Sequence, residues 1–278
     1  MPELPEVENV RKTLEKLVLG KELQEVTVTW PKIIKRPDDT EAFCLLLSGQ
    51  RINSMNRRGK FLIFELDDYA LVSHLRMEGK YELGGTKAPD KHTHVRFFFS
   101  DGTELRYKDV RKFGTMHLFP KGEEKRSLPL MQLGPEPADN QTFSKEYLER
   151  TFKKTTRTIK AVLLDQRVIA GLGNIYVDES LFKAGIHPDA KAADLTSEEA
   201  ELLRESIIEI INHAVAKGGS SVRSYVNSIG EEGGFQLELN VYGRKGELCN
   251  RCGSEIKKTV TAGRGTHYCP LCQALASE

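Results

Sequence analysis

The spacing of apolar residues predicts a helix at the start of the chain and a long run of strands after it. Before Gly20, apolar residues recur at helical spacing on one stripe, at Val7, Val10, Leu14 and Leu17. From about Leu23 to Phe119 the period changes to two, which is typical of strands. Within that stretch, Asp101-Gly102 joins two apolar segments as in a β-hairpin. This half of the chain therefore predicts a β-sandwich or a barrel-like domain.

A helical period returns after Gly134-Pro135-Glu136-Pro137-Ala138-Asp139-Asn140, which we interpret as a hinge. Ser144 is placed to cap a short helix, and Thr196-Ser197-Glu198-Glu199 is a capping box for a longer helix that ends near Lys217. The glycine-rich, polar stretch over 218–234 predicts a loop. The second half of the chain is thus expected to be mainly helical, with an irregular segment inside it.

Length and charge leave several classes of protein open. At 278 residues, 39% of them hydrophobic, the chain is long enough for more than one domain. Its 41 basic and 40 acidic residues give a formal net charge of +1, so a surface for nucleic acid requires these charges to be sorted onto separate faces. No apolar run approaches the length of a membrane span, and no leader-like segment begins the chain. We expect a soluble cytoplasmic protein.

Four of the five cysteines form two CxxC pairs near the end of the chain. The first pair is Cys249 and Cys252, the second is Cys269 and Cys272, and residues 253–268 separate them. This spacing is typical of a tetrahedral zinc ribbon, and four sulfur ligands leave no open position, so the site is structural. A redox role is the alternative, although one pair would be enough for it. Cys44 precedes a run of leucines and is predicted to be a buried thiol.

The first six residues, Met1-Pro2-Glu3-Leu4-Pro5-Glu6, offer a nucleophile. Removal of Met1 leaves Pro2 with a secondary amine, which forms an iminium ion without an N–H at a carbonyl-like carbon. An α-amino group with a pKa of ~7.7–8.0 is roughly a tenth unprotonated at pH 7, whereas a lysine near ~10.4 is under about a thousandth. Glu3 and Glu6 are candidates for proton transfer. The alternative is a plain helix start, with Pro5 and Glu6 at favoured positions.

Three segments combine positive charge or backbone amides with glycine. Arg57-Arg58-Gly59-Lys60 precedes a predicted strand and suits an anionic ligand or a solvated strand end. Ala170-Gly171-Leu172-Gly173-Asn174-Ile175-Tyr176 places Asn174 as the cap of a helix, which is typical of a phosphate site or of a tight turn between helices. Gly263-Arg264-Gly265 is expected to form a hairpin tip, where the arginine either meets a phosphate or is simply exposed.

Two further segments, His74-Leu75-Arg76-Met77 and Arg111-Lys112-Phe113, mix cations with a large apolar side chain. In proteins that bind duplex DNA, such side chains wedge between base pairs. The alternative places Met77 and Phe113 in the core. His92 and His94 favour phosphate or structural roles over metal binding, because the cysteines already form a complete metal site.

In chain order, these motifs resemble those of the bacterial formamidopyrimidine-DNA glycosylases, the base-excision enzymes for oxidised purines. The matching pieces are Pro2-Glu3-Leu4-Pro5-Glu6-Val7-Glu8, Arg57-Arg58-Gly59-Lys60, Asp109-Val110-Arg111-Lys112-Phe113-Gly114, Leu133-Gly134-Pro135-Glu136-Pro137, Gly173-Asn174-Ile175-Tyr176 and the four cysteines. The resemblance implies an α+β multidomain fold. Its parts are an N-terminal catalytic β-sandwich with flanking helices over 1–134, a hinge over 135–143, a helix–two-turn–helix domain with a mobile lesion loop over 144–240, and a C-terminal β-hairpin zinc finger over 241–278.

The resemblance also implies a bifunctional glycosylase and AP lyase that removes 8-oxoguanine and formamidopyrimidines and then leaves a one-nucleotide gap by β,δ-elimination. Pro2 is matched to the nucleophile, Glu3 to the proton donor for base release and ring opening, Lys60 to the donor of β-elimination and Arg264 to that of δ-elimination. One structural zinc ion and no organic cofactor are expected. The residues expected to contact damaged double-stranded DNA are Glu6, His74, Met77, His92, Arg111, Phe113, Asn174, Ser220, Arg223, Tyr225 and Lys258.

The implied protein is a monomer of the bacterial cytoplasm, associated with the nucleoid through DNA and not with a membrane. Two other functions stay open. An endonuclease VIII-like enzyme would use the same terminal proline on oxidised pyrimidines, but the Glu-Leu-Pro-Glu start and the lesion loop favour the purine enzyme. A non-catalytic DNA-binding protein with a zinc ribbon would explain the cysteines without any use of Pro2.

Overall fold

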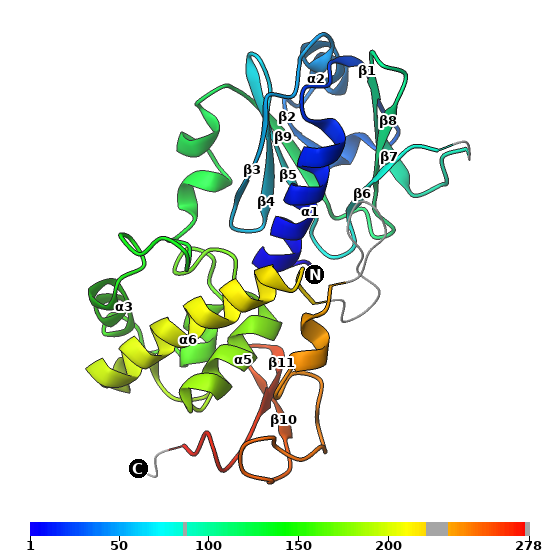
Figure 1. Cartoon of the computed structure of the whole chain (residues 1–278). Helices are drawn as coiled ribbons and strands as arrows, with labels where there is room; N and C mark the ends of the chain where they lie inside the picture. Colours follow the sequence, from blue (N-terminus) through cyan, green and yellow to red (C-terminus); the bar gives the residue numbers. More distant parts are fainter. Residues whose placement is uncertain (86–87, 221–232, 276–278) are drawn as a thin grey trace. The chain divides into compact units, whose positions relative to one another are not determined.

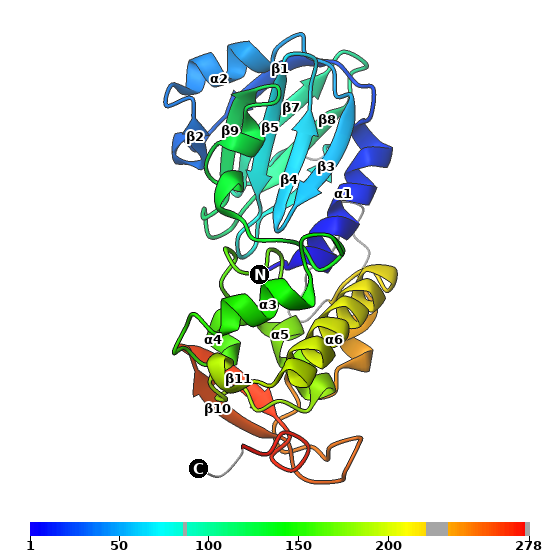
Figure 2. The ribbon, with the colours of Figure 1, turned by 90° about the vertical axis from the view of Figure 1, so that its left-hand side faces the viewer.

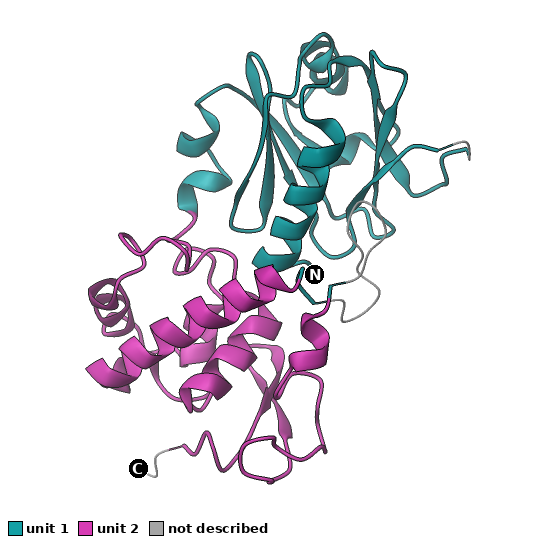
Figure 3. Cartoon of the chain, in the orientation of Figure 1, with its two compact units in different colours: residues 1–132, 218–233 teal, residues 133–217, 234–278 magenta. Residues whose placement is uncertain are grey.

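The structure is a computed structural model that describes residues 1–85, 88–220 and 233–275. The chain divides into two compact units, shown in Figure 3. Unit 1 comprises Met1–Gln132 with Gly218–Gly233, and unit 2 comprises Leu133–Lys217 with Gly234–Glu278. Across the described ranges, no helix is both long enough and apolar enough to cross a membrane. The finer division into four parts stays a prediction.

Unit 1 is a sandwich of two β-sheets with helices at its edges, as Figures 1 and 2 show. One sheet has five strands in the order β2-β9-β5-β4-β3, and the other has four in the order β1-β7-β8-β6. The strands are β1 (Leu23–Val28), β2 (Ile34–Arg36), β3 (Ser54–Arg58), β4 (Phe61–Glu65), β5 (Tyr69–His74), β6 (Lys80–Leu83), β7 (Thr93–Phe99), β8 (Glu104–Lys108) and β9 (Thr115–Pro120). The helical elements are α1 (Leu4–Val18), α2 (Thr40–Leu47) and the 3-10 turns η1 (Pro31–Ile33), η2 (Glu124–Arg126) and η3 (Leu130–Gln132).

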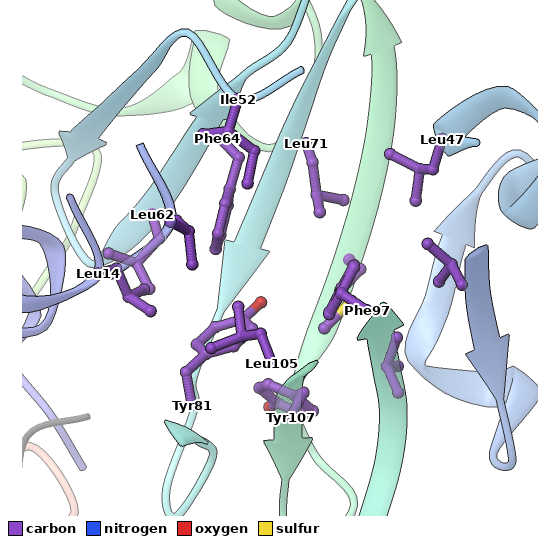
Figure 4. Packing of buried hydrophobic residues seen from close by; sticks show 14 of the residues in the cluster. Leu14, Leu47, Ile52, Leu62, Phe64, Leu71, Tyr81, Phe97, Leu105 and Tyr107 are labelled. Atoms are coloured by element: carbon purple, nitrogen blue, oxygen red, sulfur yellow. The ribbon is translucent and has the colours of Figure 1, made fainter. Parts of the chain in front are cut away.

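The core of unit 1 lies between the two sheets (Figure 4). Phe64 and Leu71 come from the five-stranded sheet, and Phe97 and Leu105 come from the four-stranded one; all are buried. Tyr81 is buried among them and donates a hydrogen bond from its hydroxyl to Ser73 Oγ at 2.7 Å, so its polar group is satisfied inside the core. The sandwich predicted from the period-two pattern is confirmed.

In its described residues, unit 2 contains four α-helices and one β-hairpin (Figure 2). These are α3 (Lys145–Phe152), α4 (Ile159–Leu163), α5 (Asn174–Ala184), α6 (Ser197–Ala216), β10 (Lys257–Thr261) and β11 (Arg264–Tyr268), with the 3-10 turns η4 (Ala192–Asp194) and η5 (Phe235–Glu238). The caps predicted at Ser144 and Thr196 are confirmed. Ser144 Oγ accepts a hydrogen bond from Tyr147 N at 3.2 Å, and Thr196 forms the expected capping box with Glu199.

Two local predictions in unit 2 are wrong. The N-cap of α5 is Gly173, and Asn174 is already the first helical residue. The hairpin turns at Ala262 and Gly263, which both have positive φ, and Arg264 is the first residue of β11, opposite Thr261. A two-residue turn with positive φ at both positions matches the twist of the strands it joins, which explains why the tip lies one residue earlier than expected.

Cys44, predicted to be buried, is only half-buried against the core of unit 1. Cys44 lies in α2, a short helix with one buried face and one exposed face. Leu47 is fully buried, whereas Leu45 is 75% exposed. The run of leucines that suggested a buried segment therefore spans both faces of a short helix.

The two leucines allow a matched test of the core. We expect Leu47→Ala to lower the free energy of unfolding by ~2–5 kcal/mol, because it leaves a cavity, and Leu45→Ala to change it by less than ~0.5 kcal/mol. Trp30, the only tryptophan, packs against this core, so its fluorescence in urea reports on unit 1. Equal effects of the two substitutions would contradict the placement of α2.

Candidate active site

The first residues of the chain are held in a buried position at the start of α1. Pro2 is buried, and so are the side chains of Glu3 and Glu6. Glu3 is the N-cap of α1, and its backbone N–H donates to Glu6 Oε2 at 2.8 Å. Because the cap fixes the backbone of Glu3, it also orients the peptide that joins Glu3 to Pro2. A terminal amine at Pro2 would thus lie beside two carboxylates.

The same helix holds the first residues of the glycine-rich stretch. Ser220 N donates to Glu6 Oε1 at 2.7 Å, and Asn9 Nδ2 donates to Gly218 O at 3.0 Å. Gly219 has φ +82°, and a Cβ there would meet Glu6 Oε1 at 2.7 Å, so the close approach requires glycine. The structure therefore brings two of the predicted site residues, Glu6 and Ser220, into contact.

Arg223 and Tyr225, which are also predicted site residues, lie outside the described residues. The role of Asn9 was not foreseen, since an asparagine inside a helix gives no signal of a partner more than two hundred positions away. Its hydrogen bond to the backbone of Gly218 is visible only once the chain is folded.

Lys60 lies at the same end of unit 1 as Pro2. Arg11 Nη1 donates to Met55 O at 3.0 Å, and Arg57 Nε donates to Glu8 Oε2 at 3.1 Å, so α1 and β3 run antiparallel. The turn that follows β3 consequently lies at the N-terminal end of α1. Lys60 is in this turn and is 5% exposed, and its neighbour Gly59 has φ +58°.

The register of the five-stranded sheet brings His74 to this end as well. Phe61, next to Lys60, pairs with His74, and His74 pairs with Thr115. His74 Nδ1 accepts a hydrogen bond from Arg76 N at 2.8 Å, which leaves the ring proton on Nε2. Burial, and then the charges of Arg76 and Lys60, lower the pKa of His74 to about 3. The imidazole is therefore neutral and offers Nε2–H to an acceptor such as a phosphate.

The loop before Thr115 is folded around the carboxylate of Asp109. This carboxylate accepts hydrogen bonds from the backbone N–H groups of Arg111, Phe113 and Gly114 at 3.0, 2.9 and 2.8 Å. A Cβ at Gly114 would collide with the hydroxyl of Tyr107, so the loop fits only with glycine there. The anchoring role of Asp109 was not foreseen from the sequence, because it depends on the folded turn.

The apolar side chains at this end are exposed. Phe113 is 52% exposed, with the Arg111 guanidinium 4.7 Å from its ring centroid, and Met77 is 37% exposed. The alternative that placed Met77 and Phe113 in the core is therefore wrong. His92 is next to the loop, since its carbonyl oxygen accepts a hydrogen bond from Asp109 N at 3.0 Å. All the predicted site residues of unit 1 that the structure describes lie at this one end.

The remaining predicted residues gather around the hairpin of unit 2. Asn174 Nδ2 donates to Gly265 O at 2.8 Å, directly after Arg264. Arg264 and Lys258 are exposed, and Lys258 Cε lies 3.4 Å from where a Cβ of Gly265 would be. The structure therefore gathers the predicted polar and cationic residues into two groups, one in each unit.

The four cysteines converge as a zinc site requires. Their sulfur atoms all lie within 4.8 Å of one another, with Cys252 and Cys269 at 3.4 Å and Cys249 and Cys272 at 3.9 Å. Four sulfurs around one zinc ion at Zn–S distances of ~2.3 Å are about 3.8 Å apart, so the cluster fits the metal. Backbone N–H groups of Arg251 and Cys272 point at sulfur, each at 3.4 Å.

Family comparisons cover nearly the whole chain. The model of the formamidopyrimidine-DNA glycosylase N-terminal domain matches residues 1–116, that of the formamidopyrimidine-DNA glycosylase H2TH domain matches 133–226, and that of the zinc finger found in FPG and IleRS matches 246–275. The chain belongs to the formamidopyrimidine-DNA glycosylase family.

Individual relatives agree with this. Formamidopyrimidine-DNA glycosylases of Bacillus cereus and Bacillus licheniformis are 59% and 61% identical over 274 residues, which cover 98% of this chain and 99% of each relative. The structure of Lactococcus lactis Fpg in complex with DNA containing an abasic site is 45% identical, with a TM-score of 0.92, and the match covers 98% of this chain and 100% of that one. The predicted family, α+β fold and single structural zinc ion are confirmed.

Removal of one sulfur ligand tests the metal site. We expect Cys269→Ser to lose most of the bound zinc and to unfold the hairpin, because structural zinc contributes an apparent ~10–16 kcal/mol to modules of this size. Cys44→Ser is the matched control and should retain one zinc ion per chain. Atomic emission spectrometry of the purified proteins measures both. Full zinc occupancy in Cys269→Ser would contradict a four-sulfur site.

The lowered pKa of His74 predicts an acid-sensitive unit 1. Between the ordinary value of 6.5 and about 3, the unfolded chain binds a proton that the folded chain does not, so the free energy of unfolding falls as the pH falls through this window. We expect His74→Gln to remove this part of the pH dependence, which amounts to a few kcal/mol at most. His92→Gln is the control, and Trp30 fluorescence in urea at several pH values is the measurement. An unchanged pH profile in His74→Gln would count against a neutral buried imidazole.

Proposed function

We propose that this chain is a base-excision repair enzyme, a bifunctional DNA glycosylase and AP lyase that removes 8-oxoguanine and formamidopyrimidines from duplex DNA. The observation that carries the proposal is the position of Pro2, buried beside Glu3 and Glu6 at the end of unit 1 that also holds Lys60. A plain helix start does not need two buried carboxylates next to its first residue, and a DNA-binding protein without chemistry does not need the amine.

The first half of the reaction is displacement of the base. After removal of Met1, the nitrogen of Pro2 attacks C1′ of the damaged nucleotide and gives up its proton. The glycosidic bond breaks, and the base leaves with the bonding electron pair and takes up a proton. The bond from C1′ to the ring oxygen then opens, and Glu3 protonates that oxygen. The product is an iminium ion between Pro2 and C1′, and it acts as an electron sink.

The second half consists of two eliminations. Loss of a proton from C2′ allows the C3′–O bond to break, and the phosphate on that side leaves with the electron pair; Lys60 is assigned to proton transfer in this step. Loss of a proton from C4′ then allows the C5′–O bond to break, with Arg264 as the assisting group. Hydrolysis of the iminium returns Pro2, and the DNA is left with a one-nucleotide gap bearing phosphate at both ends.

The residues around these groups are assigned to DNA. Phosphates are contacted by cations and by N–H donors, which are His74, Asn174, Lys258 and Arg264. Exposed Met77 and Phe113, with Arg111, fill the space that the extruded base leaves, which offsets part of the few kcal/mol that extrusion costs. His92, which lies near the loop anchored by Asp109, is assigned to a contact with a DNA strand. Glu6, Ser220, Arg223 and Tyr225 are assigned to the extruded nucleotide.

With this function, the protein is expected in the bacterial cytoplasm, at the nucleoid through its contacts with DNA. It is expected to be a monomer with one structural zinc ion and no organic cofactor.

A second candidate is an enzyme that acts on oxidised pyrimidines through the same amine. One solved relative is Lactococcus lactis Fpg in complex with DNA that contains an oxidised pyrimidine. Substrate tests therefore include duplexes with thymine glycol beside those with 8-oxoguanine opposite cytosine.

Borohydride trapping tests the role of Pro2. The wild-type protein, with loss of Met1 verified by mass spectrometry, is expected to become covalently joined to duplex DNA with 8-oxoguanine or an abasic site. Pro2→Gly leaves a primary amine, whose imine can lose its N–H proton and then no longer acts as an electron sink. We expect it to reduce trapping by roughly 10²-fold or more, while binding to the duplex changes little. Pro5→Gly is the control for altered helix geometry. A parallel loss of binding and trapping would reject the assignment, and so would a wild-type protein that binds damaged DNA without cross-linking.

A further inference from the structure

A fully buried ion pair in unit 2 belongs to none of the groups assigned so far. Lys160 of α4 and Asp178 of α5 have completely buried side chains, and Lys160 Nζ lies 2.6 Å from Asp178 Oδ1. Removal of two charges from water is expensive, and the attraction between them compensates only when hydrogen bonds satisfy their remaining atoms. A buried ion pair is therefore weak evidence for a stabilising role. The other groups that the pair binds are a better guide to what it does.

The pair also binds the backbone of β11. Lys160 Nζ also donates to Gly265 O at 3.3 Å, and His267 N donates to Asp178 Oδ2 at 2.9 Å. The ion pair thus binds a carbonyl and an N–H of the strand that starts at Arg264. Hydrogen bonds that involve a charged group are stronger than neutral ones, so this contact holds the strand at Gly265 and His267.

The backbone directly after the guanidinium-bearing residue is held from further sides. Gly265 O accepts a second hydrogen bond, from Asn174 Nδ2 at 2.8 Å, and Arg264 O accepts one from Thr266 Oγ1 at 2.9 Å. The side chain of Arg264 itself is exposed. The structure therefore fixes the backbone from which this side chain extends and leaves the guanidinium accessible to a ligand.

The zinc cluster alone does not explain this arrangement. The cysteines anchor the other end of the hairpin, where Arg251 of the first CxxC pair stacks on Phe182 at 4.6 Å and donates to Phe182 O at 3.4 Å, near the end of α5. The tip of the hairpin, beside Arg264, is the end away from the sulfur atoms. There β11 is held by Lys160, Asp178 and Asn174. The opposite strand is held by a hydrogen bond from Thr261 Oγ1 to Asp189 Oδ1 at 2.6 Å.

We propose that Lys160 and Asp178 are positioning residues for Arg264. The pair holds β11 so that the guanidinium is presented to the sugar fragment during the second elimination, and it does so with no net charge of its own. Neither residue touches substrate. This inference rests on the proposed function, in which Arg264 assists breakage of the C5′–O bond.

The test removes both charges together. In Lys160→Met with Asp178→Asn, no buried charge is left unpaired. Met fills the space of the lysine side chain as far as Cε, and Asn keeps an acceptor oxygen for His267 N. Arg264→Ala is the reference variant. Full-length, zinc-loaded proteins act on a duplex with one abasic site, and the readouts are the ratio of δ- to β-elimination product, borohydride trapping and zinc content.

We expect the double variant to trap DNA and to retain zinc as the wild type does, while the δ-to-β ratio falls by roughly 10- to 100-fold, since a displacement of about 1 Å can cost a factor of ~10². The product pattern should match that of Arg264→Ala. Addition of Arg264→Ala to the double variant should cause no further fall, because both changes act through one group. A merely structural role would lower trapping and both eliminations together.

A wild-type δ-to-β ratio in the double variant would overturn the proposal, and so would a parallel loss of trapping and both products. If the double variant fails to fold, Lys160→Gln with Asp178→Asn carries the test, because both side chains are then neutral and can still form hydrogen bonds. The expected result is an intermediate δ-to-β ratio at full zinc content, and an unchanged ratio is the contrary one. Failure of the proposed function is seen separately, because the wild type itself would then neither trap nor cleave DNA.

Discussion

The arrangement at the end of unit 1 depends on one carboxylate. Glu6 accepts a hydrogen bond from Glu3 N with one oxygen and from Ser220 N with the other, so a single buried side chain ties the start of the chain to a segment more than two hundred residues later. A buried carboxylate is tolerated only when its oxygens are bound in this way. The antiparallel packing of α1 and β3 then brings Lys60 to the same end of unit 1, and the sheet register adds His74.

Local physics made much of the fold predictable. Apolar periodicity gave α1 its buried stripe, Asp101-Gly102 marked the turn between β7 and β8, and Ser144 and Thr196 marked helix starts, because each of these signals acts within a few residues. The cysteine spacing predicted the zinc site for the same reason. The shift of the α5 cap to Gly173 was not predictable, since the side chain of Asn174 is taken up by Gly265 O in a distant strand. The hairpin tip lies at Ala262 and Gly263 because the strands are joined by a two-residue turn with positive φ.

The residues of the candidate site also fall into those that the sequence predicts and those that only the structure shows. Pro2, Lys60 and Arg264 stand in motifs that are legible in the sequence, and the resemblance to a known family gave them roles. The residues that hold them in place carry no such signal. Asp109, Asn9 and the Lys160–Asp178 pair act through backbone groups that are far away in the chain, and only the folded structure brings these groups within reach. A net charge near zero likewise concealed how many charges are buried or paired.

The phenol ring of Tyr107 links two exposed apolar residues that the sequence keeps apart. Its hydroxyl lies where a side chain would project from Gly114, after Phe113, and also where one would project from Gly79, shortly after Met77. The turn and the loop are thus seated on the same fixed surface, which is itself buried between the sheets. The backbone segments that carry Met77 and Phe113 therefore share one support, and a larger residue at Gly79 or at Gly114 would push against the same hydroxyl group.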